Sequence, residues 1–208
     1  IQDLRQPNTD STKVVLKNWN EQTKTEVLML INNQSQTIYW TLLQHGDWNL
    51  HLAATDKGLC YVGSANKPYA EMEEWVRKHF PKAALEQNDE IMRSYADEMN
   101  EYLTGKLADF TISFDLAGTS FQKSVWDALC AIPYGRTCSY SEIAQHIGKP
   151  ASVRAVGTAI GANPVLISVP CHRVIGKNGS LTGYRGGLDM KTRLLELEKS
   201  KTGHRVHG

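Results

Sequence analysis

Residues 139–164 read SYSEIAQHIGKPASVRAVGTAIGANP, and this stretch decides the fold of the second half of the chain. Its first part, residues 141–148, has the pattern of a short helix that ends at a glycine, and Pro150 then marks a turn. Ser152 is a suitable N-cap for a second helix, which has to end before Asn163 because a residue that precedes proline favours an extended conformation. Two short helices joined by a tight turn predict a helix-turn-helix unit. The pattern is weak by itself, because many pairs of packed helices share it.

The charge of the chain is divided unevenly around this unit. Residues 119–208 contain 12 Lys and Arg against 5 Asp and Glu, a net charge of +7. Residues 1–118 contain 11 against 17, a net charge of −6, so the whole chain carries only +1. A basic half that holds a helix-turn-helix favours DNA as the partner of that half. The alternative is a solvated basic face without a partner.

The segment in front of the helix-turn-helix predicts one more helix. Thr119 or Ser120 is a suitable N-cap, and Pro133 ends the helix. Its apolar stripe has helical spacing and consists of Phe121, Val125, Leu129 and Ile132. The second half of the chain is therefore expected to be mainly helical.

The first half of the chain has the pattern of an α/β structure that follows a polar extension. Three segments rich in β-branched and aromatic residues are separated by turn residues, which predicts an antiparallel meander. These segments are residues 37–43, 49–54 and 59–62. Two helices are expected at residues 69–80 and at about 88–103. Apolar side chains then alternate from Phe110 to Leu116, which predicts a half-buried strand.

Composition narrows the class of protein. With 208 residues the chain has room for one or two domains, and 41% hydrophobic with 22% charged residues is typical of a globular protein. The longest strictly apolar run, residues 27–31, is too short to cross a bilayer, and no secretory signal pattern stands at the start. We therefore expect a cytoplasmic protein without a membrane-spanning segment.

The four cysteines indicate neither a disulfide framework nor a zinc site. Cys60, Cys130, Cys138 and Cys171 form no CxxC pair and no cluster with histidine at zinc spacing, so no metal is expected. The first three lie inside strand or helix patterns and are interpreted as small buried hydrophobic residues. Cys171 is the exception.

Cys171 stands in a setting suited to thiolate chemistry. Residues 165–169 predict a buried apolar strand, and Pro170 and then Cys171, His172 and Arg173 follow it. Neighbouring imidazole and guanidinium charges can lower the pKa of a free thiol from about 8.5. Adjacent residues of a regular strand point to opposite faces. His172 can therefore take the proton of Cys171 only if Pro170 kinks the chain or a water bridges the two side chains.

The sequence Pro170-Cys171-His172-Arg173-Val174 resembles the signature of the alkylguanine-DNA alkyltransferases, which repair DNA by direct reversal of damage. Other blocks of the chain resemble blocks of this family in the same order. They are residues 139–144, 154–157, 161–164, 183–188, Lys191 and residues 194–198. The resemblance is dense over residues 119–199, loose over residues 37–118 and absent over residues 1–36.

The resemblance implies a fold of the α/β class with two domains. Residues 37–117 correspond to an N-terminal ribonuclease H-like α/β domain. Residues 118–203 correspond to a C-terminal helical, winged helix-turn-helix alkyltransferase domain, which binds DNA and accepts the alkyl group. Residues 1–36 are then an N-terminal extension, and residues 204–208 are a tail.

The resemblance also implies a reaction. A methyl or other alkyl group moves from oxygen-6 of guanine to the sulfur of Cys171, and the product is a thioether. Nothing in the sequence offers a way to reverse this step, so each molecule is expected to act once. The implied partner is double-stranded DNA that contains alkylated guanine, with alkylated thymine as a minor substrate. No cofactor is implied, and a monomer is expected.

Three residues besides Cys171 are implied in catalysis. His172 acts as a base through a water, and Glu198 orients it. Asn163 connects the second helix of the helix-turn-helix to the active-site segment. The simpler interpretations are a solvated helix position for Glu198 and a helix C-cap for Asn163.

Four residues are implied in contacts with the damaged DNA. A stacked base cannot present its methyl carbon in line with the thiolate, so the nucleotide has to be flipped out. Arg154 then fills the vacated stack, Tyr140 crowds the target phosphate and donates a hydrogen bond to the base, and Tyr184 lies against the base. Arg185 belongs to the same glycine-rich loop, at a position that varies in the family, so the resemblance does not fix which bulky alkyl groups fit. The simpler interpretations are a phosphate contact for Arg154, a core position for Tyr140 and an ordinary surface turn for the loop.

Three other functions are compatible with parts of the sequence. A lesion sensor of the same fold would bind alkylguanine without reacting, and the presence of Cys171 argues against it. A transcription factor would combine the helix-turn-helix with an acidic sensing domain, but no activation segment or second DNA-binding unit is visible. A cysteine hydrolase is disfavoured, because no glycine motif for an oxyanion hole precedes the cysteine.

Overall fold

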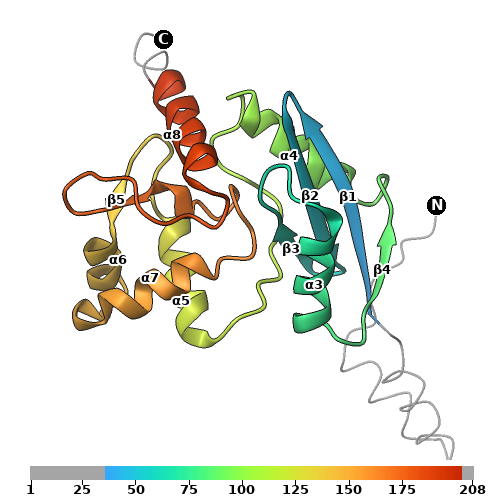
Figure 1. Cartoon of the computed structure of the whole chain (residues 1–208), viewed down its shortest axis with the longest axis horizontal. Coiled ribbons are helices and arrows are strands. Elements are labelled where there is room, and N and C mark those ends of the chain that lie inside the picture. The colour runs from blue at the N-terminus through green and yellow to red at the C-terminus, as the bar shows by residue number, and fades with distance from the viewer. Residues whose placement is uncertain (1–35, 203–208) are drawn as a thin grey trace, which may run out of the picture. The chain divides into compact units, whose positions relative to one another are not determined.

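The first half of the chain forms a four-stranded mixed sheet (Figure 1). The computed structural model describes residues 36–202. The expected antiparallel meander is confirmed by strands β1 (Thr37–His45), β2 (Trp48–Thr55) and β3 (Gly58–Val62). A further strand that the sequence pattern does not predict, β4 (Ala84–Gln87), pairs in parallel with β1. The strand order is therefore β3-β2-β1-β4.

The two faces of this sheet pack against different helices. Helix α3 (Tyr69–His79) covers one face, where Met72 and Val76 are buried with Ala53 of β2. Helix α4 (Arg93–Leu103) packs on the other face, where Met99 is buried with Leu52 of β2. Neighbouring residues of β2 thus serve opposite faces, as the two-residue period of a strand requires.

One of the two helices predicted in this half has nearly the expected bounds, and the other is shorter than predicted. The helix expected at residues 69–80 is confirmed by α3. The helix expected at residues 88–103 begins only at Arg93, since the amide Oδ1 of Asn88 accepts from the N–H of Ile91 and the chain turns there instead.

The second half of the chain is mainly helical, as expected. Its elements are α5 (Ser120–Cys130), β5 (Cys138–Ser139), α6 (Tyr140–His146), the 3₁₀ turn η2 (Pro150–Ser152), α7 (Val153–Gly161), the 3₁₀ turn η3 (Cys171–Arg173), β6 (Val174–Ile175) and α8 (Leu188–Thr202). Capping boxes start α5 at Thr119 and α6 at Ser139. Ser152 occupies the N-cap position of α7, but its side chain makes no capping hydrogen bond. Helices α6 and α7 confirm the predicted helix-turn-helix.

Two predicted strands are wrong. In the alternating segment from Phe110 to Leu116, only Phe114 forms a bridge, with Leu59 of β3. The carboxylate of Glu98 accepts from the N–H of Thr111, so this part of the segment does not extend the sheet. The alternation of side chains between interior and solvent is still present, because an extended chain shows it without a partner strand.

The apolar segment at residues 165–169 is a turn rather than a strand. Val165 forms an isolated bridge with Val62, but Ile167 has a φ of +71°, outside the β region, and the N–H of Val169 donates to the carbonyl of Val165. Burial explains why the sequence misleads here. Val165, Leu166, Ile167 and Val169 are all at most 1% exposed, and a buried turn has the same apolar composition as a buried strand.

One hydrophobic cluster continues from the sheet into the helical half. Leu52 and Tyr102 belong to it together with Leu129, Ile160 and Leu194. The described residues from Thr37 onwards thus form one compact unit. Within residues 36–202, no helix is long and apolar enough to span a bilayer. The expected extension, except Gln36, and the expected tail at residues 204–208 lie outside the described residues.

Candidate active site

Cys171 lines a pocket beside the helix-turn-helix. It is the first residue of η3, and only 3% of it is exposed. Pro170, with φ of −80° and ψ of 57°, kinks the chain between the apolar segment and Cys171, which is one of the two alternatives expected from the sequence. The pocket has a volume of about 280 Å³ and is lined by Tyr140, Gly157, Ile160, Gly161, Cys171, Gly183, Tyr184 and Arg185. Four of the predicted site residues therefore meet at one cavity.

Asn163 connects the end of α7 to the cysteine. Its buried amide donates from Nδ2 to Cys171 Sγ at 3.0 Å and to the carbonyl of Val169 at 2.9 Å. Its Oδ1 accepts from the N–H of Val165 at 3.0 Å. These bonds shape the turn after α7 and direct an amide N–H at the sulfur, which favours the thiolate over the thiol.

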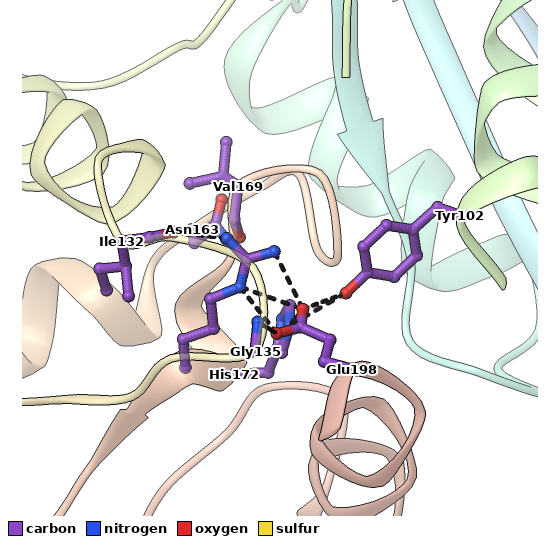
Figure 2. Close-up of polar contacts among 8 residues, drawn as sticks. Tyr102, Ile132, Gly135, Asn163, Val169, His172 and Glu198 are labelled. Atoms are coloured by element: carbon purple, nitrogen blue, oxygen red, sulfur yellow. Dashed lines mark hydrogen bonds and ion pairs between the residues drawn. The ribbon is translucent and has the colours of Figure 1, made fainter. Parts of the chain in front are cut away.

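His172 and Glu198 form a buried pair next to Cys171, drawn in Figure 2. His172 Nε2 lies 2.8 Å from Glu198 Oε1, and both side chains are at most 1% exposed. A neutral imidazole that donates from Nε2 carries its lone pair on Nδ1. Nδ1 is buried and has no hydrogen-bond partner among the described residues. This nitrogen is therefore the one that can accept a proton, and the water expected between it and Cys171 stays a prediction.

The carboxylate of Glu198 is surrounded by donors (Figure 2). Arg173 donates from Nε to both oxygens, at 3.0 and 3.1 Å, and the N–H of Gly135 donates to Oε2 at 2.8 Å. The hydroxyl of Tyr102 donates to Oε1 at 2.5 Å. A buried carboxylate is stable only when it is paired and hydrogen-bonded in this way. The simpler interpretation of Glu198, a solvated helix position, is wrong because its exposure is 0%.

Burial and charge set the protonation states of the site. Burial raises the pKa of the Cys171 thiol, although the Asn163 hydrogen bond and the charges of Arg185 and Lys191 act against this rise. Burial also lowers the pKa of His172, although Glu198 acts in the opposite direction. Burial would raise the pKa of Glu198, but His172 and Arg173 outweigh it and hold that pKa at about 2. At neutral pH the pair is thus a carboxylate and a neutral imidazole, and the thiol needs a base.

Two tyrosines form walls of the pocket. Tyr140, the first residue of α6, donates from its hydroxyl to the carbonyl of Thr182 at 3.2 Å. A Cβ atom added to Gly157 of α7 would stand 3.7 Å from the Tyr140 ring, so the helix passes close to this ring. The Tyr184 ring stands edge-on to His172, with 6.5 Å between the ring centroids. Aromatic walls around a narrow cavity suit a flat, unstacked base.

The guanidinium of Arg185 is directed into the protein. It donates to the carbonyls of Val62 (2.7 Å), Asn163 (3.1 Å) and Pro164 (3.1 Å) and lies 5.2 Å from the centre of the Tyr61 ring. These bonds tie the pocket loop to β3 and to the segment after α7. A contact of Arg185 with DNA stays a prediction.

Arg154 differs from the other predicted site residues because it is exposed, on the outer side of α7. Several other positively charged side chains of the basic half are bonded to other groups of the protein. Arg173 and Lys191 are buried, Arg185 is bonded as described above, and Arg193 pairs with Asp47 at 2.6 Å. The +7 charge of the sequence therefore overstates the charge that this half can offer to a polyanion.

Two residues that touch the site are given no role from the sequence, although Lys191 belongs to the blocks that resemble the family. Tyr102 lies on the apolar stripe of α4 and reads as an ordinary core tyrosine. Lys191 has a weak signal, because it shares the buried face of α8 with Leu194 and Glu198, seven residues further on. Its Nζ donates to the carbonyls of Val174 at 2.5 Å and Thr182 at 2.8 Å, which fixes the pocket loop.

Family models match both halves of the chain. The model described as "6-O-methylguanine DNA methyltransferase, ribonuclease-like domain" matches residues 38–116, and "6-O-methylguanine DNA methyltransferase, DNA binding domain" matches residues 120–200. An inducible methylated-DNA–protein-cysteine methyltransferase of Bacillus subtilis is 63% identical over 163 residues, which cover 78% of this chain and 91% of that protein. A relative from Methanosarcina acetivorans is 42% identical and covers 78% of this chain and 99% of its own length.

Solved structures agree with these matches. The Mycobacterium tuberculosis O6-methylguanine methyltransferase superposes with a TM-score of 0.69 at 40% identity, over 79% of this chain and 94% of that one. A structure of M. tuberculosis OGT in complex with DNA superposes with a TM-score of 0.67 at 41% identity, over the same shares. The chain belongs to the 6-O-methylguanine DNA methyltransferase family of DNA repair proteins.

Proposed function

We propose that this protein repairs alkylated double-stranded DNA by moving a methyl or other alkyl group from oxygen-6 of guanine to Cys171, once per molecule. One observation carries the proposal: the buried Cys171 lines a pocket beside a helix-turn-helix, the Asn163 amide donates to its sulfur, and the next residue of the chain, His172, forms a buried pair with Glu198. An inert structural cysteine needs neither the pocket nor the pair. The M. tuberculosis relative solved with DNA supports a DNA substrate.

The transfer has two coupled parts. The Cys171 proton passes through one water to His172 Nδ1, and Glu198 stabilises the imidazolium that results. The sulfur lone pair then forms a bond to the alkyl carbon, while the electron pair of the carbon–oxygen bond stays on oxygen-6. The guanine anion that remains takes up one proton, which balances the proton that Cys171 lost to His172, and the DNA leaves with an ordinary guanine. The thioether on Cys171 is stable, which makes the transfer irreversible and stoichiometric.

The DNA contacts follow from the shape of the site. The alkylated nucleotide leaves the duplex and enters the pocket between Tyr140 and Tyr184, because the sulfur is buried and cannot reach a stacked base. Arg154 projects from α7 into the gap that the nucleotide leaves. Tyr140 also stands next to the phosphate of that nucleotide. Alkylated thymine is a minor substrate in this proposal.

Intact-protein mass spectrometry tests the proposal directly. The full chain is mixed with excess duplex that contains one O6-methylguanine, and each molecule should gain the mass of one CH₂ and no more. Peptide mapping should place it on Cys171. Cys171→Ser should abolish the gain and keep DNA binding, whereas Cys130→Ser, which alters an exposed thiol, should change nothing. Tight binding without any mass gain would favour the lesion sensor, and repeated turnover by unmodified protein would refute a stoichiometric acceptor.

Three further expectations stay predictions. They are domain boundaries near residues 37 and 118, a monomeric state and a cytoplasmic location. Sedimentation of the protein with and without DNA would test the second.

A further inference from the structure

The hydroxyl of Tyr102 contacts both members of the buried pair. It donates to Glu198 Oε1 at 2.5 Å, and its oxygen lies 3.2 Å from His172 Nε2. Figure 2 shows Tyr102 reaching the carboxylate from the first half of the chain, whereas His172 and Glu198 come from the second. Tyr102 itself is fully buried on α4. The two halves of the protein therefore meet at the relay.

The ring of Tyr102 is held by packing that does not involve its hydroxyl. It stacks on Phe110, with 5.2 Å between centroids, and stands edge-on to Tyr134 at 5.8 Å. Replacement of Tyr102 by phenylalanine would keep these ring contacts and remove one polar atom. The role of the hydroxyl can thus be separated from the role of the side chain in the core.

The hydroxyl competes for the charge of Glu198. Oε1 also lies within hydrogen-bonding distance of His172 and Arg173. Each donor withdraws negative charge from this oxygen, so donation by Tyr102 weakens the support that the carboxylate can give to a protonated His172. Burial and the neighbouring Glu198 raise the pKa of Tyr102 well above its ordinary value, so the hydroxyl stays a donor throughout the neutral range.

We propose that Tyr102 is a positioning residue of the relay, whose hydroxyl holds His172 in the neutral form with the proton on Nε2 and the lone pair on Nδ1. The inference rests on the proposed function, in which Nδ1 takes the proton of Cys171. It gives the first half of the chain a part in the chemistry, because α4 has to be docked for the relay to be complete.

Other groups also face His172 and have to be accounted for. They are Glu198 and Lys191 from α8, Arg173 from η3 and Tyr184 from the pocket loop, and Cys171 is the neighbour of His172 in the chain. The positive charges of Arg173 and Lys191 also favour neutral His172. All five groups are unchanged when only the Tyr102 hydroxyl is removed, so a comparison of the wild-type protein with Tyr102→Phe isolates the hydroxyl.

Two titrations of the full chain test the inference. The first follows the single-turnover rate of demethylation of an O6-methylguanine duplex against pH. The second follows the ring ¹⁵N shifts of His172 without DNA, with His172→Gln used to identify its signal. In Tyr102→Phe, both midpoints should move to higher pH by about half a unit to one unit, the size of one hydrogen bond to a charged group after partial transmission. Affinity for the methylated duplex should stay unchanged.

A matched control is available on the same helix. Tyr95 is half-buried on α4 and packs on the core without contact to the pair, so Tyr95→Phe should leave both midpoints in place. Unmoved midpoints in Tyr102→Phe, with or without a uniform loss of rate, would overturn the inference and leave Tyr102 as a packing residue. A shift to lower pH would overturn it as well, since the hydroxyl would then support the imidazolium. The proposed relay predicts that the wild-type rate falls at acid pH and that this fall disappears in His172→Gln. If this is not observed, the relay is wrong, and the inference about Tyr102 is wrong with it.

Discussion

The side chains behind Cys171 depart from the rule that ionisable groups stay in water. Glu198 and Lys191 are 0% exposed and Arg173 is 5% exposed. Each is held by specific partners: Glu198 by Arg173 and Gly135, and Lys191 by backbone carbonyls. Groups buried in this way stabilise a fold only as complete sets, because removal of one partner leaves the other without compensation. The same burial separates the protonation states on which the proposed transfer depends.

The state of His172 makes the transfer rate depend on pH with a defined sign. Burial lowers the pKa of His172, so the imidazole becomes protonated only below its ordinary value of 6.5. A protonated His172 cannot accept the proton of Cys171, and the single-turnover rate should therefore be level near neutral pH and fall at a midpoint below 6.5. His172→Gln should remove this acid limb and slow transfer by roughly 10²- to 10⁴-fold, the range of general-base catalysis.

The measurement is rapid-quench demethylation over pH 5 to 8 at saturating protein, with duplex affinity measured in parallel as the control. An acid limb that persists in His172→Gln would assign the titration to another group.

In the proposed function, the helix-turn-helix serves both DNA binding and chemistry. Its second helix, α7, presents Arg154 to solvent and buries Val156 and Ile160 on the opposite side. Trp126 of α5 donates to the carbonyl of Ala159 at 2.8 Å, which fixes the helix against the core. At its end, the chain reaches Asn163 and thereby the sulfur. The helix that we propose to meet DNA thus leads within two residues to the side chain that contacts the sulfur of Cys171.

Arg154→Ala should slow repair of duplex DNA more than transfer from the free base. Only the duplex needs the flipped state to be held open, and flipping costs a few kcal/mol, so loss of the side chain should lower the duplex rate by about tenfold or more. Transfer from free O6-methylguanine should change by less than about twofold. The free energy of unfolding should stay within about 0.5 kcal/mol, because Arg154 is exposed.

Lys149→Ala is the matched control, since this exposed cation lies in the turn between the two helices and not on α7. It should weaken binding without this difference between substrates. If Arg154→Ala lowers the transfer rate equally for the duplex and for the free base, Arg154 contacts a phosphate or supports the fold instead.

In the described residues as a whole, some of the positive side chains are bonded to the protein itself and others are exposed to solvent. Arg173, Arg185, Lys191 and Arg193 of the basic half are bonded to the protein itself. Arg185 and Arg193 join the two halves, through Val62 and Asp47. The cations that remain exposed on the helical half include Arg136, Lys149, Arg154 and Lys177. These are the charges that can neutralise DNA phosphates.

Affinity for undamaged duplex should therefore fall linearly with salt on logarithmic axes, with a slope of about −4 to −5, as expected for contacts with about 4 to 6 phosphates. Lys149→Ala should reduce the magnitude of the slope by about 0.9. Arg193→Ala removes the same charge from a site already paired with Asp47 and should leave the slope unchanged. Fluorescence anisotropy across a salt series measures all three.

A flat salt dependence would contradict the backbone-contact model. So would a strong preference for one undamaged sequence, which would favour the transcription factor instead, because phosphate contacts carry no sequence information.

The sequence by itself determined those features that depend only on residues close together in the chain. Glycine and proline signals and the helical period placed α5, α6 and α7, and Thr119 was also recognisable as the N-cap of α5, because these signals act within one or two turns of the chain. The signature around Cys171 also sufficed to name the reactive sulfur and its neighbour His172 as candidates.

Only the tertiary structure decided which distant groups meet. Tyr102 lies 70 residues from His172 and 96 from Glu198, and nothing local separates it from an ordinary core tyrosine. The sequence allowed Glu198 to be solvated, whereas packing buried it, and only the packed structure shows that Arg185 donates to the carbonyl of Val62. The physical reason is that a buried charge is stable only next to hydrogen-bonding or charged partners, and these partners can come from any part of the chain that packs around it. The distance between two residues along the chain does not indicate whether they become such partners.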